Sequence, residues 1–123
     1  MDNEKLIIVG KLYQKLNIIA GTDLPNMEIY CSIGLSVHLK KSNHGNCLKY
    51  IKEIPEIIEN PDYVGKNPKE PNSIELVKKF SENILVAIKL DIKENYLYVA
   101  SLYDVSQTKV ERRLHSDRLK KFN

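Results

Sequence analysis

The amino-acid sequence predicts an α+β fold: N-terminal helices packed on an antiparallel β-sheet meander, followed by a C-terminal helix. The first observation is a change of hydrophobic period. Apolar residues recur with a helical period in much of the first half of the chain and with the two-residue period of a strand after residue 72. The second is length, because 123 residues can bury one hydrophobic core without disulfide or metal crosslinks. We therefore expect residues 1–123 to form one domain.

The first half is predicted to hold two short strands and several helices. The strands, at residues 5–10 and 28–31, are short runs rich in apolar residues. The helices follow from apolar residues spaced three or four apart, as Leu12 and Leu16 are. They cover residues 11–20, 34–41, 45–53 and 55–59. Pro55 separates the last two, because proline disfavours helical angles at the preceding residue but suits the first turn of a new helix.

The second half is predicted to be mainly sheet. Residues 62–72 contain one glycine and two prolines and are expected to form an irregular loop. Three strands then follow, joined by turns short enough for hairpins, so they should form an antiparallel meander. The predicted strands cover residues 73–80, 84–91 and 96–104. Ser106 is a suitable N-cap for a last helix, which Ser116 and Asp117 are expected to end before a basic tail.

Charge and cysteine content exclude several classes of protein. Nineteen basic and sixteen acidic residues give a net charge of +3, too small an excess to indicate nucleic-acid binding by itself. The cations are nevertheless clustered in a basic segment: Lys109, Arg112, Arg113, Arg118, Lys120 and Lys121. Cys31 and Cys47 lack the spacing of a metal site, and we interpret them as reduced core residues of a cytoplasmic protein. No apolar run is long enough for a membrane span, so no membrane partner is predicted.

The titratable residues favour chemistry without a metal ion or other cofactor. Motifs for phosphate-binding loops, zinc hydrolases and serine hydrolases are absent from the sequence. Asp91 and Asp104 end neighbouring predicted strands and are candidates to meet, but two acids are few for a magnesium nuclease. His, Lys, Arg and Ser side chains can instead cleave RNA through its own 2′-hydroxyl. A base removes that proton, an acid protonates the leaving oxygen, and cations stabilise the charge on the phosphate.

His38 is the first candidate for the acid or base, since an unperturbed imidazole has a pKa of about 6.5. It lies on the predicted 34–41 helix, three residues before Lys41. The alternative is a purely structural interpretation, in which His38 is a packing residue and the basic segment is a solvated surface. Glu75, on the strand face opposite Ile74 and Leu76, is interpreted as pointing to solvent.

Several segments of the chain also have a familiar order and spacing. They are residues 23–25, 29–30, 37–41, 54–65, 73–77, 101–103 and 112–121. The most specific is the run from Ile54 to Gly65, IPEIIENPDYVG, taken together with His38. This pattern resembles the phage-associated barnase–EndoU–colicin–RelE-like nuclease domains. The resemblance implies helices packed on an antiparallel sheet and metal-independent ribonuclease activity. It also implies RNA such as tRNA or mRNA as the substrate, and an antitoxin or immunity protein as a partner.

By position, the resemblance implies two sets of functional residues. The expected catalytic residues are His38, Arg113 and Ser116. The expected RNA-binding and phosphate-binding residues are Lys41, Arg112 and Arg118. The sequence departs from the family pattern in two places. Relatives often carry His-Pro-Glu where Ser42 to Gly45 stands here, and often a glycine in place of Asp117.

The sequence therefore predicts a toxin-like or phage-associated endoribonuclease that leaves a 2′,3′-cyclic phosphate. The main alternative is a non-catalytic nucleic-acid or protein-binding module of phage or mobile-element origin, whose basic segments contact phosphate backbones. A third interpretation is an immunity or antitoxin protein. Such proteins are usually acidic, so the charge of +3 disfavours this interpretation.

Overall fold

The computed structural model describes residues 5–32, 34–35 and 45–123, with the side chains of 45–48 left out. Its centre is a seven-stranded sheet with the strand order β1-β2-β6-β5-β4-β3-β7. The strands are β1 (Leu6–Lys11), β2 (Glu28–Ser32), β3 (Tyr63–Gly65), β4 (Ser73–Lys79), β5 (Asn83–Asp91), β6 (Tyr96–Val105) and β7 (Leu119–Lys121). Neighbouring strands are antiparallel except β2 and β6, which are parallel. The predicted α+β class and the β4–β5–β6 meander are confirmed.

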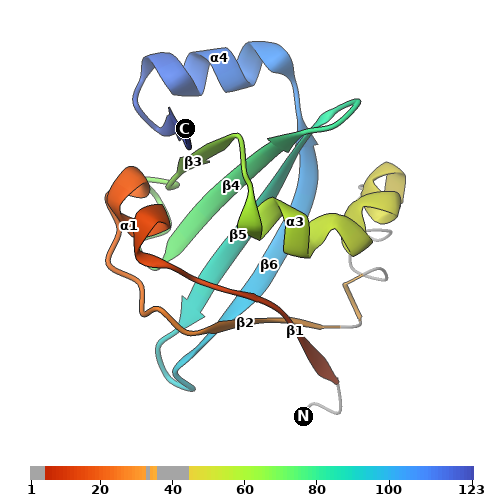
Figure 1. Cartoon of the computed structure of the whole chain (residues 1–123), viewed down its shortest axis with the longest axis vertical. Helices are drawn as coiled ribbons and strands as arrows, with labels where there is room; N and C mark the ends of the chain where they lie inside the picture. The colour runs from red at the N-terminus through yellow and green to blue at the C-terminus, as the bar shows by residue number, and fades with distance from the viewer. Residues whose placement is uncertain (1–4, 33, 36–44) are drawn as a thin grey trace.

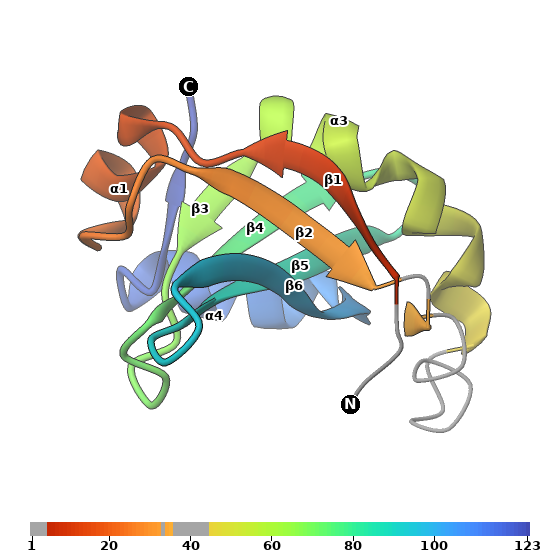
Figure 2. The same cartoon turned by 90° about the horizontal axis from the view of Figure 1, so that it is seen from below.

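Helices lie on both faces of this sheet. The described ones are α1 (Gln14–Ala20), the 3-10 helix η1 (Gly45–Glu53), α3 (Ile54–Glu59) and α4 (Gln107–His115). Figure 2 shows α1 and α3 on one side of the sheet and α4 on the other. In Figure 1, α4 lies at the top, across one end of strands β4 to β6.

The main core fills the space between the sheet and the helices α1 and α3. Ile74, Leu76 and Val86 point to this side, since residues two apart in a strand share a face, and all three are fully buried. The Tyr13 hydroxyl ties the two helices together by donating to the carbonyl oxygens of Ile58 at 2.8 Å and Glu59 at 2.9 Å. Burial, with the nearby Glu59 carboxylate, raises the pKa of Tyr13 to about 12.

A second, smaller core lies beneath α4. Its fully or nearly fully buried residues come from α4 and from strands β4 to β7: Val77, Leu85, Val105, Val110 and Leu119. The helix begins as predicted, because the Ser106 side chain accepts a hydrogen bond from the Lys109 backbone N–H at 3.1 Å. Apolar side chains therefore pack against both faces of the sheet. On the face that carries α4, they cover only part of the sheet.

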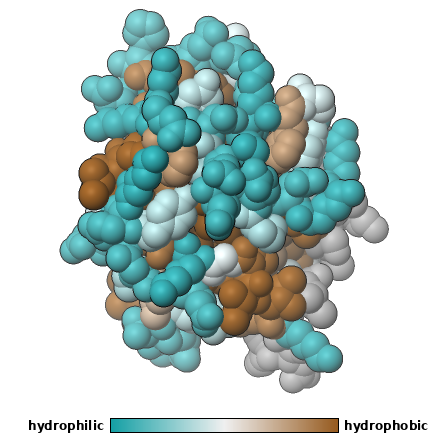
Figure 3. All heavy atoms as spheres, viewed as in Figure 1, coloured by the Kyte–Doolittle hydropathy of each residue, from teal (hydrophilic) through white to brown (hydrophobic). Residues whose placement is uncertain are grey.

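The surface is mostly polar with a few apolar patches. Figure 3 shows two of these patches, over α1 and over the beginning of β1. Exposed large apolar residues in these elements are Leu6, Ile7 and Ile8 of β1 and Ile18 of α1. Cys31 is a free, buried thiol as predicted, whereas the side chain of Cys47 lies outside the described residues.

Several predicted boundaries change in the structure. The segment at 45–53 is a 3-10 helix, and α1 begins at Gln14 because β1 continues to Lys11. Residues 62–72, predicted to be irregular, contribute β3, and the basic tail contributes β7. The predicted approach of Asp91 to Asp104 is wrong. Antiparallel pairing puts Asp91 opposite Tyr96 and Asp104 opposite Ile84, at the two ends of the β5–β6 pair.

Gly65 permits the close contact between β3 and β7. A Cβ atom at this position would lie 1.8 Å from the backbone oxygen of Arg118 and 3.0 Å from the Leu119 Cα. The same Arg118 oxygen accepts a hydrogen bond from the Lys66 N–H at 3.2 Å. A side chain at Gly65 would therefore separate the two strands.

Gly65→Ala is expected to lower the free energy of unfolding by about 3 kcal/mol, because rigid backbone would have to move. Urea unfolding measures this loss. Gly10→Ala is the matched control, since its Cβ would meet only side-chain atoms of Ile58, the nearest at 3.1 Å, and no backbone atom. Equal losses in both variants would contradict the assigned role of Gly65.

Candidate active site

The face of the sheet that carries α4 is only partly covered by described helices (Figure 1). The helix packs over the end of the strands that holds Val77, Leu85 and Val105. Toward the other end, strand register puts polar and aromatic side chains on this same face, because paired residues of neighbouring strands share a side. We call this surface the open face; its residues are Tyr30, Ser73, Glu75, Lys89, Tyr96, Tyr98 and Ser101.

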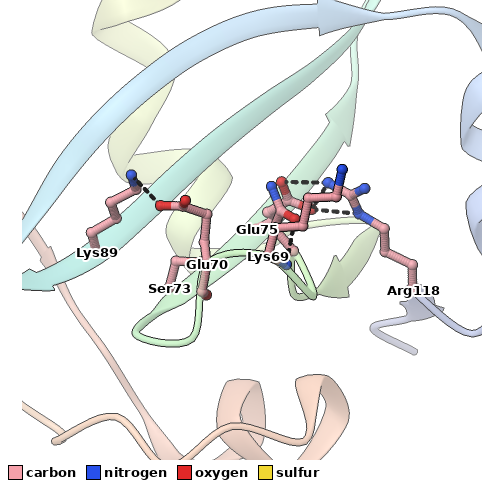
Figure 4. A network of polar contacts seen from close by, with 7 residues as sticks. Lys69, Glu70, Ser73, Glu75, Lys89 and Arg118 are labelled. Carbon is pink, nitrogen blue, oxygen red and sulfur yellow. Dashed lines mark hydrogen bonds and ion pairs between the residues drawn. The ribbon is translucent and has the colours of Figure 1, made fainter.

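An ion pair between Glu75 and Arg118 lies at the β4 edge of the open face. The guanidinium of Arg118 donates from Nε to Oε1 at 3.2 Å, and from Nη2 to Oε1 and Oε2, both at 3.1 Å. Its remaining nitrogen, Nη1, takes no part in this pairing. The Glu75 side chain is only 3% exposed, and that of Arg118 is 23% exposed. Figure 4 shows the two groups facing each other.

The interpretation of Glu75 as a solvent-facing side chain is therefore wrong. The face opposite Ile74 and Leu76 is not solvent here, because Arg118 covers the carboxylate and the second core begins at Val77. A signal was present in the sequence: β4 continues on the Glu75 side with Val77, an apolar residue. Consecutive apolar residues, as at Leu76 and Val77, are typical of a strand buried on both faces.

A second ion pair joins β5 to the loop before β4. Lys89 Nζ lies 2.5 Å from Glu70 Oε1 (Figure 4). The hydrogen bond with Glu70 raises the pKa of Lys89, helped by the charge of Glu70 and by Tyr98, although partial burial acts in the opposite direction. Ser73 holds the loop in place by donating its hydroxyl to the Glu70 carbonyl oxygen at 2.8 Å. The open face thus carries two cations, each beside a carboxylate.

A cavity of about 470 Å³ lies beside Arg118. It is lined by Lys66, Pro68, Ser116, Asp117 and Arg118. Two residues expected to be functional, Ser116 and Arg118, therefore share one cavity, with Lys66 as an additional cation. Lys66 Nζ donates to the Gly21 carbonyl oxygen at 3.2 Å, and the Ser116 hydroxyl donates to the Arg113 carbonyl oxygen at 3.2 Å.

The two arginines of α4 have different environments. Arg113 is three residues after the buried Val110, and its Nη1 is inaccessible to solvent and has no hydrogen-bond partner among the described residues. An unpaired buried donor is unfavourable, so this nitrogen contributes nothing to stability through the described contacts. Arg112 is exposed and lies two residues from Val110, on the outward side of the helix.

The other two expected residues, His38 and Lys41, lie outside the described residues. Within the described part of the chain, no three His, Cys, Asp or Glu side chains are grouped so as to hold a metal ion. The same part contains no helix with the length and apolar character needed to cross a membrane.

Removal of Arg118 is expected to destabilise the protein, because a buried carboxylate would lose its counter-charge. Arg118→Met should lower the free energy of unfolding by about 3 kcal/mol, whereas Glu75→Leu combined with Arg118→Met should recover most of that loss. Urea unfolding of the wild type and the three variants (each single substitution and the double) measures the coupling. If the change in unfolding free energy of the double variant equals the sum of the changes in the two single variants, Glu75 and Arg118 are not coupled.

The helix α4 ends in a backbone conformation that favours glycine. Asp117 has a φ of 64°, in the left-handed region, directly after the C-cap residue Ser116. Asp117→Gly is expected to raise the free energy of unfolding by up to about 1 kcal/mol. Asp117→Ala, which also removes the carboxylate but keeps a Cβ, is the control and should not stabilise. Thermal unfolding measures the stability of both variants. Equal stabilisation by Asp117→Gly and Asp117→Ala would show that loss of the carboxylate charge, and not relief of the backbone, is the cause.

Comparison with known proteins identifies the family. The model of the family described as phage-Barnase-EndoU-ColicinE5/D-RelE like nuclease3 matches residues 7–112. This range includes Glu75, Lys89 and the three tyrosines of the open face, and it ends before Arg113. No curated protein and no solved structure matches the chain. The match spans most of the sequence and agrees with the α+β fold, so the chain belongs to the phage-associated barnase–EndoU–colicin–RelE-like nuclease family.

Proposed function

We propose that the chain is a metal-independent endoribonuclease that uses the 2′-hydroxyl of RNA as the nucleophile. Family membership supports nuclease activity and a nucleic-acid substrate. The observation that favours this chemistry is the Glu75–Arg118 pair beside the cavity lined by Ser116. It brings a carboxylate that can accept a proton next to a cation that can hold a phosphate. We further propose that residues 1–123 act as one nuclease domain in the cytoplasm.

Arg118 is the proposed link between the phosphate and the base. In the free protein its Nε and Nη2 bind Glu75, and Nη1 remains for a phosphate oxygen. Arginine suits this role because its planar fork can bind two oxygens at once. A bound phosphate would compete with Glu75 for Nη2, which would release the carboxylate to act as a base.

The other expected residues surround this centre in the proposal. The half-buried Arg113 would bind a second phosphate oxygen through its guanidinium. Ser116 would donate a hydrogen bond to the phosphate. Lys41 would add positive potential, and the exposed Arg112 would contact a phosphate farther along the RNA.

The reaction would proceed in one displacement. Glu75 removes the proton from the 2′-oxygen, which forms a bond to phosphorus while the bond between phosphorus and the 5′-oxygen breaks. His38 donates a proton to the departing 5′-oxygen. The products are a 2′,3′-cyclic phosphate and a 5′-hydroxyl end. The arginines stabilise the negative charge that develops on the phosphate oxygens.

Incubation of the purified protein with total cellular RNA in the presence of EDTA tests this proposal. We expect cleavage that leaves cyclic phosphate ends, and no cleavage of a substrate with a 2′-deoxynucleotide at the cut site. Glu75→Gln and His38→Ala should each lower the rate at least about 100-fold, since a general acid or base contributes about 10²–10⁴-fold. Lys52→Ala, which removes an exposed cation of η1, is the control and should cleave normally.

Three outcomes would change the assignment. Cleavage that persists in His38→Ala would exclude His38 as the acid. Products with 5′-phosphate ends would exclude the 2′-hydroxyl mechanism. RNA binding without any cleavage would identify a nucleic-acid-binding module. Expression without an antitoxin or immunity protein should arrest growth if RNA such as tRNA or mRNA is cut in the cell, and Glu75→Gln should relieve that arrest.

A further inference from the structure

Three tyrosines form a cluster on the open face, away from the two cores. Tyr30 comes from β2, and Tyr96 and Tyr98 come from β6. The rings of Tyr30 and Tyr96 meet edge to face with centroids 6.2 Å apart, and those of Tyr96 and Tyr98 are tilted by 37° with centroids 5.6 Å apart. Neither hydrophobic cluster includes any of the three, and each side chain is half-buried.

The surface around these tyrosines is apolar on one side and carries an ion-paired cation on the other. On one side β1 continues it with Leu6 and Ile8, which are 45% and 54% exposed, and Ile8 is paired with Tyr30 in the sheet. On the other side Lys89 is paired with Tyr98. Adjacent aromatic rings next to a cation are typical of a surface that binds nucleic-acid bases and their phosphates.

The distance to the Glu75–Arg118 pair also suits RNA. Tyr98 and Glu75 are two strands apart and two residues out of register, because Lys89 pairs with Tyr98 and Ala87 pairs with Glu75. Standard strand dimensions make this separation about 12 Å between backbones. An extended single strand of RNA would therefore cross it in a small number of nucleotides.

We propose that Tyr30, Tyr96 and Tyr98 form a platform on which unpaired bases of single-stranded RNA stack, next to the cleavage site. The inference rests on the proposed function for the identity of the substrate. Lys89 contacts the phosphate between the stacked bases, replacing its bond to Glu70. The platform therefore selects single-stranded over double-stranded RNA, since bases in a duplex do not expose their faces.

A substrate that cannot be cleaved isolates binding from catalysis. The probe is a fluorescein-labelled decanucleotide of mixed sequence in which each 2′-hydroxyl is methylated, and fluorescence anisotropy gives its Kd at fixed salt. Tyr96→Ala and Tyr98→Ala should each weaken binding about 5- to 150-fold, as expected for the loss of one stacked base. Tyr96→Phe and Tyr98→Phe, which keep the ring, should bind within about threefold of the wild type. Ile18→Ala, at an exposed apolar residue of α1, is the control and should bind normally.

Two further measurements, the salt dependence of Kd and the binding of a probe that lacks bases, separate the contribution of stacking from that of charge. The dependence of Kd on salt should be unchanged in Tyr98→Ala but weaker in Lys89→Ala, which loses a phosphate contact. A probe with abasic sites should bind more weakly than the intact probe, and this loss should be smaller in Tyr98→Ala than in the wild type because the variant has already lost one stacked base. This comparison within one variant remains valid if that variant is less stable.

Two results would overturn the platform. One is equal binding by Tyr98→Ala and the wild type; the other is equal affinity of the wild type for the probe and for its duplex. Neither depends on catalysis. If the wild type binds the probe through the tyrosines but cleaves no RNA, the proposed nuclease function fails and the platform stands. If RNA is cleaved but the alanine variants bind the probe as the wild type does, the nuclease function stands and the platform fails.

Discussion

The structure depends on the buried ion pair between Glu75 and Arg118. A carboxylate that is almost inaccessible to water is tolerated only when a cation with suitable geometry compensates its charge. The pair joins residues 43 positions apart in the sequence and links β4 to the residue directly before the edge strand β7. Gly65 is the second requirement of the same contact, because it lets the Arg118 backbone approach β3. One interaction therefore sets both the edge of the sheet and the centre of the candidate active site.

The incomplete cover that α4 gives to its side of the sheet provides room for a site. The opposite side is filled by α1 and α3 and carries the main core. On the α4 side, apolar residues end at Val77 and Leu85, and polar and aromatic residues continue along the same strands. Charged and aromatic groups thus stand on rigid strands next to a packed core, which fixes their relative positions without a ligand.

Long elements could be predicted from the sequence and short ones could not. β5 and β6 contain 9 and 10 residues, enough for a two-residue period to be recognised. β3 and β7 have three residues each, too few to show any period, and their pairing depends on distant partners. The place of Arg118 was recognisable by resemblance, but its partner Glu75 was not, because burial of that face is created by the C-terminal segment. The tyrosine cluster depends on the parallel pairing of β2 with β6, which local pattern does not encode.

That parallel pairing has a consequence for the order of folding. Tyr30 reaches Tyr96 only after the β1–β2 pair has joined β6, and the described register between β2 and β6 consists of two residue pairs. Arg118 reaches Glu75 only after a further 43 residues have followed Glu75 in the chain. The tyrosine cluster can thus form as soon as β6 pairs with β2, whereas the Glu75–Arg118 pair forms later, when the segment that leads into β7 docks.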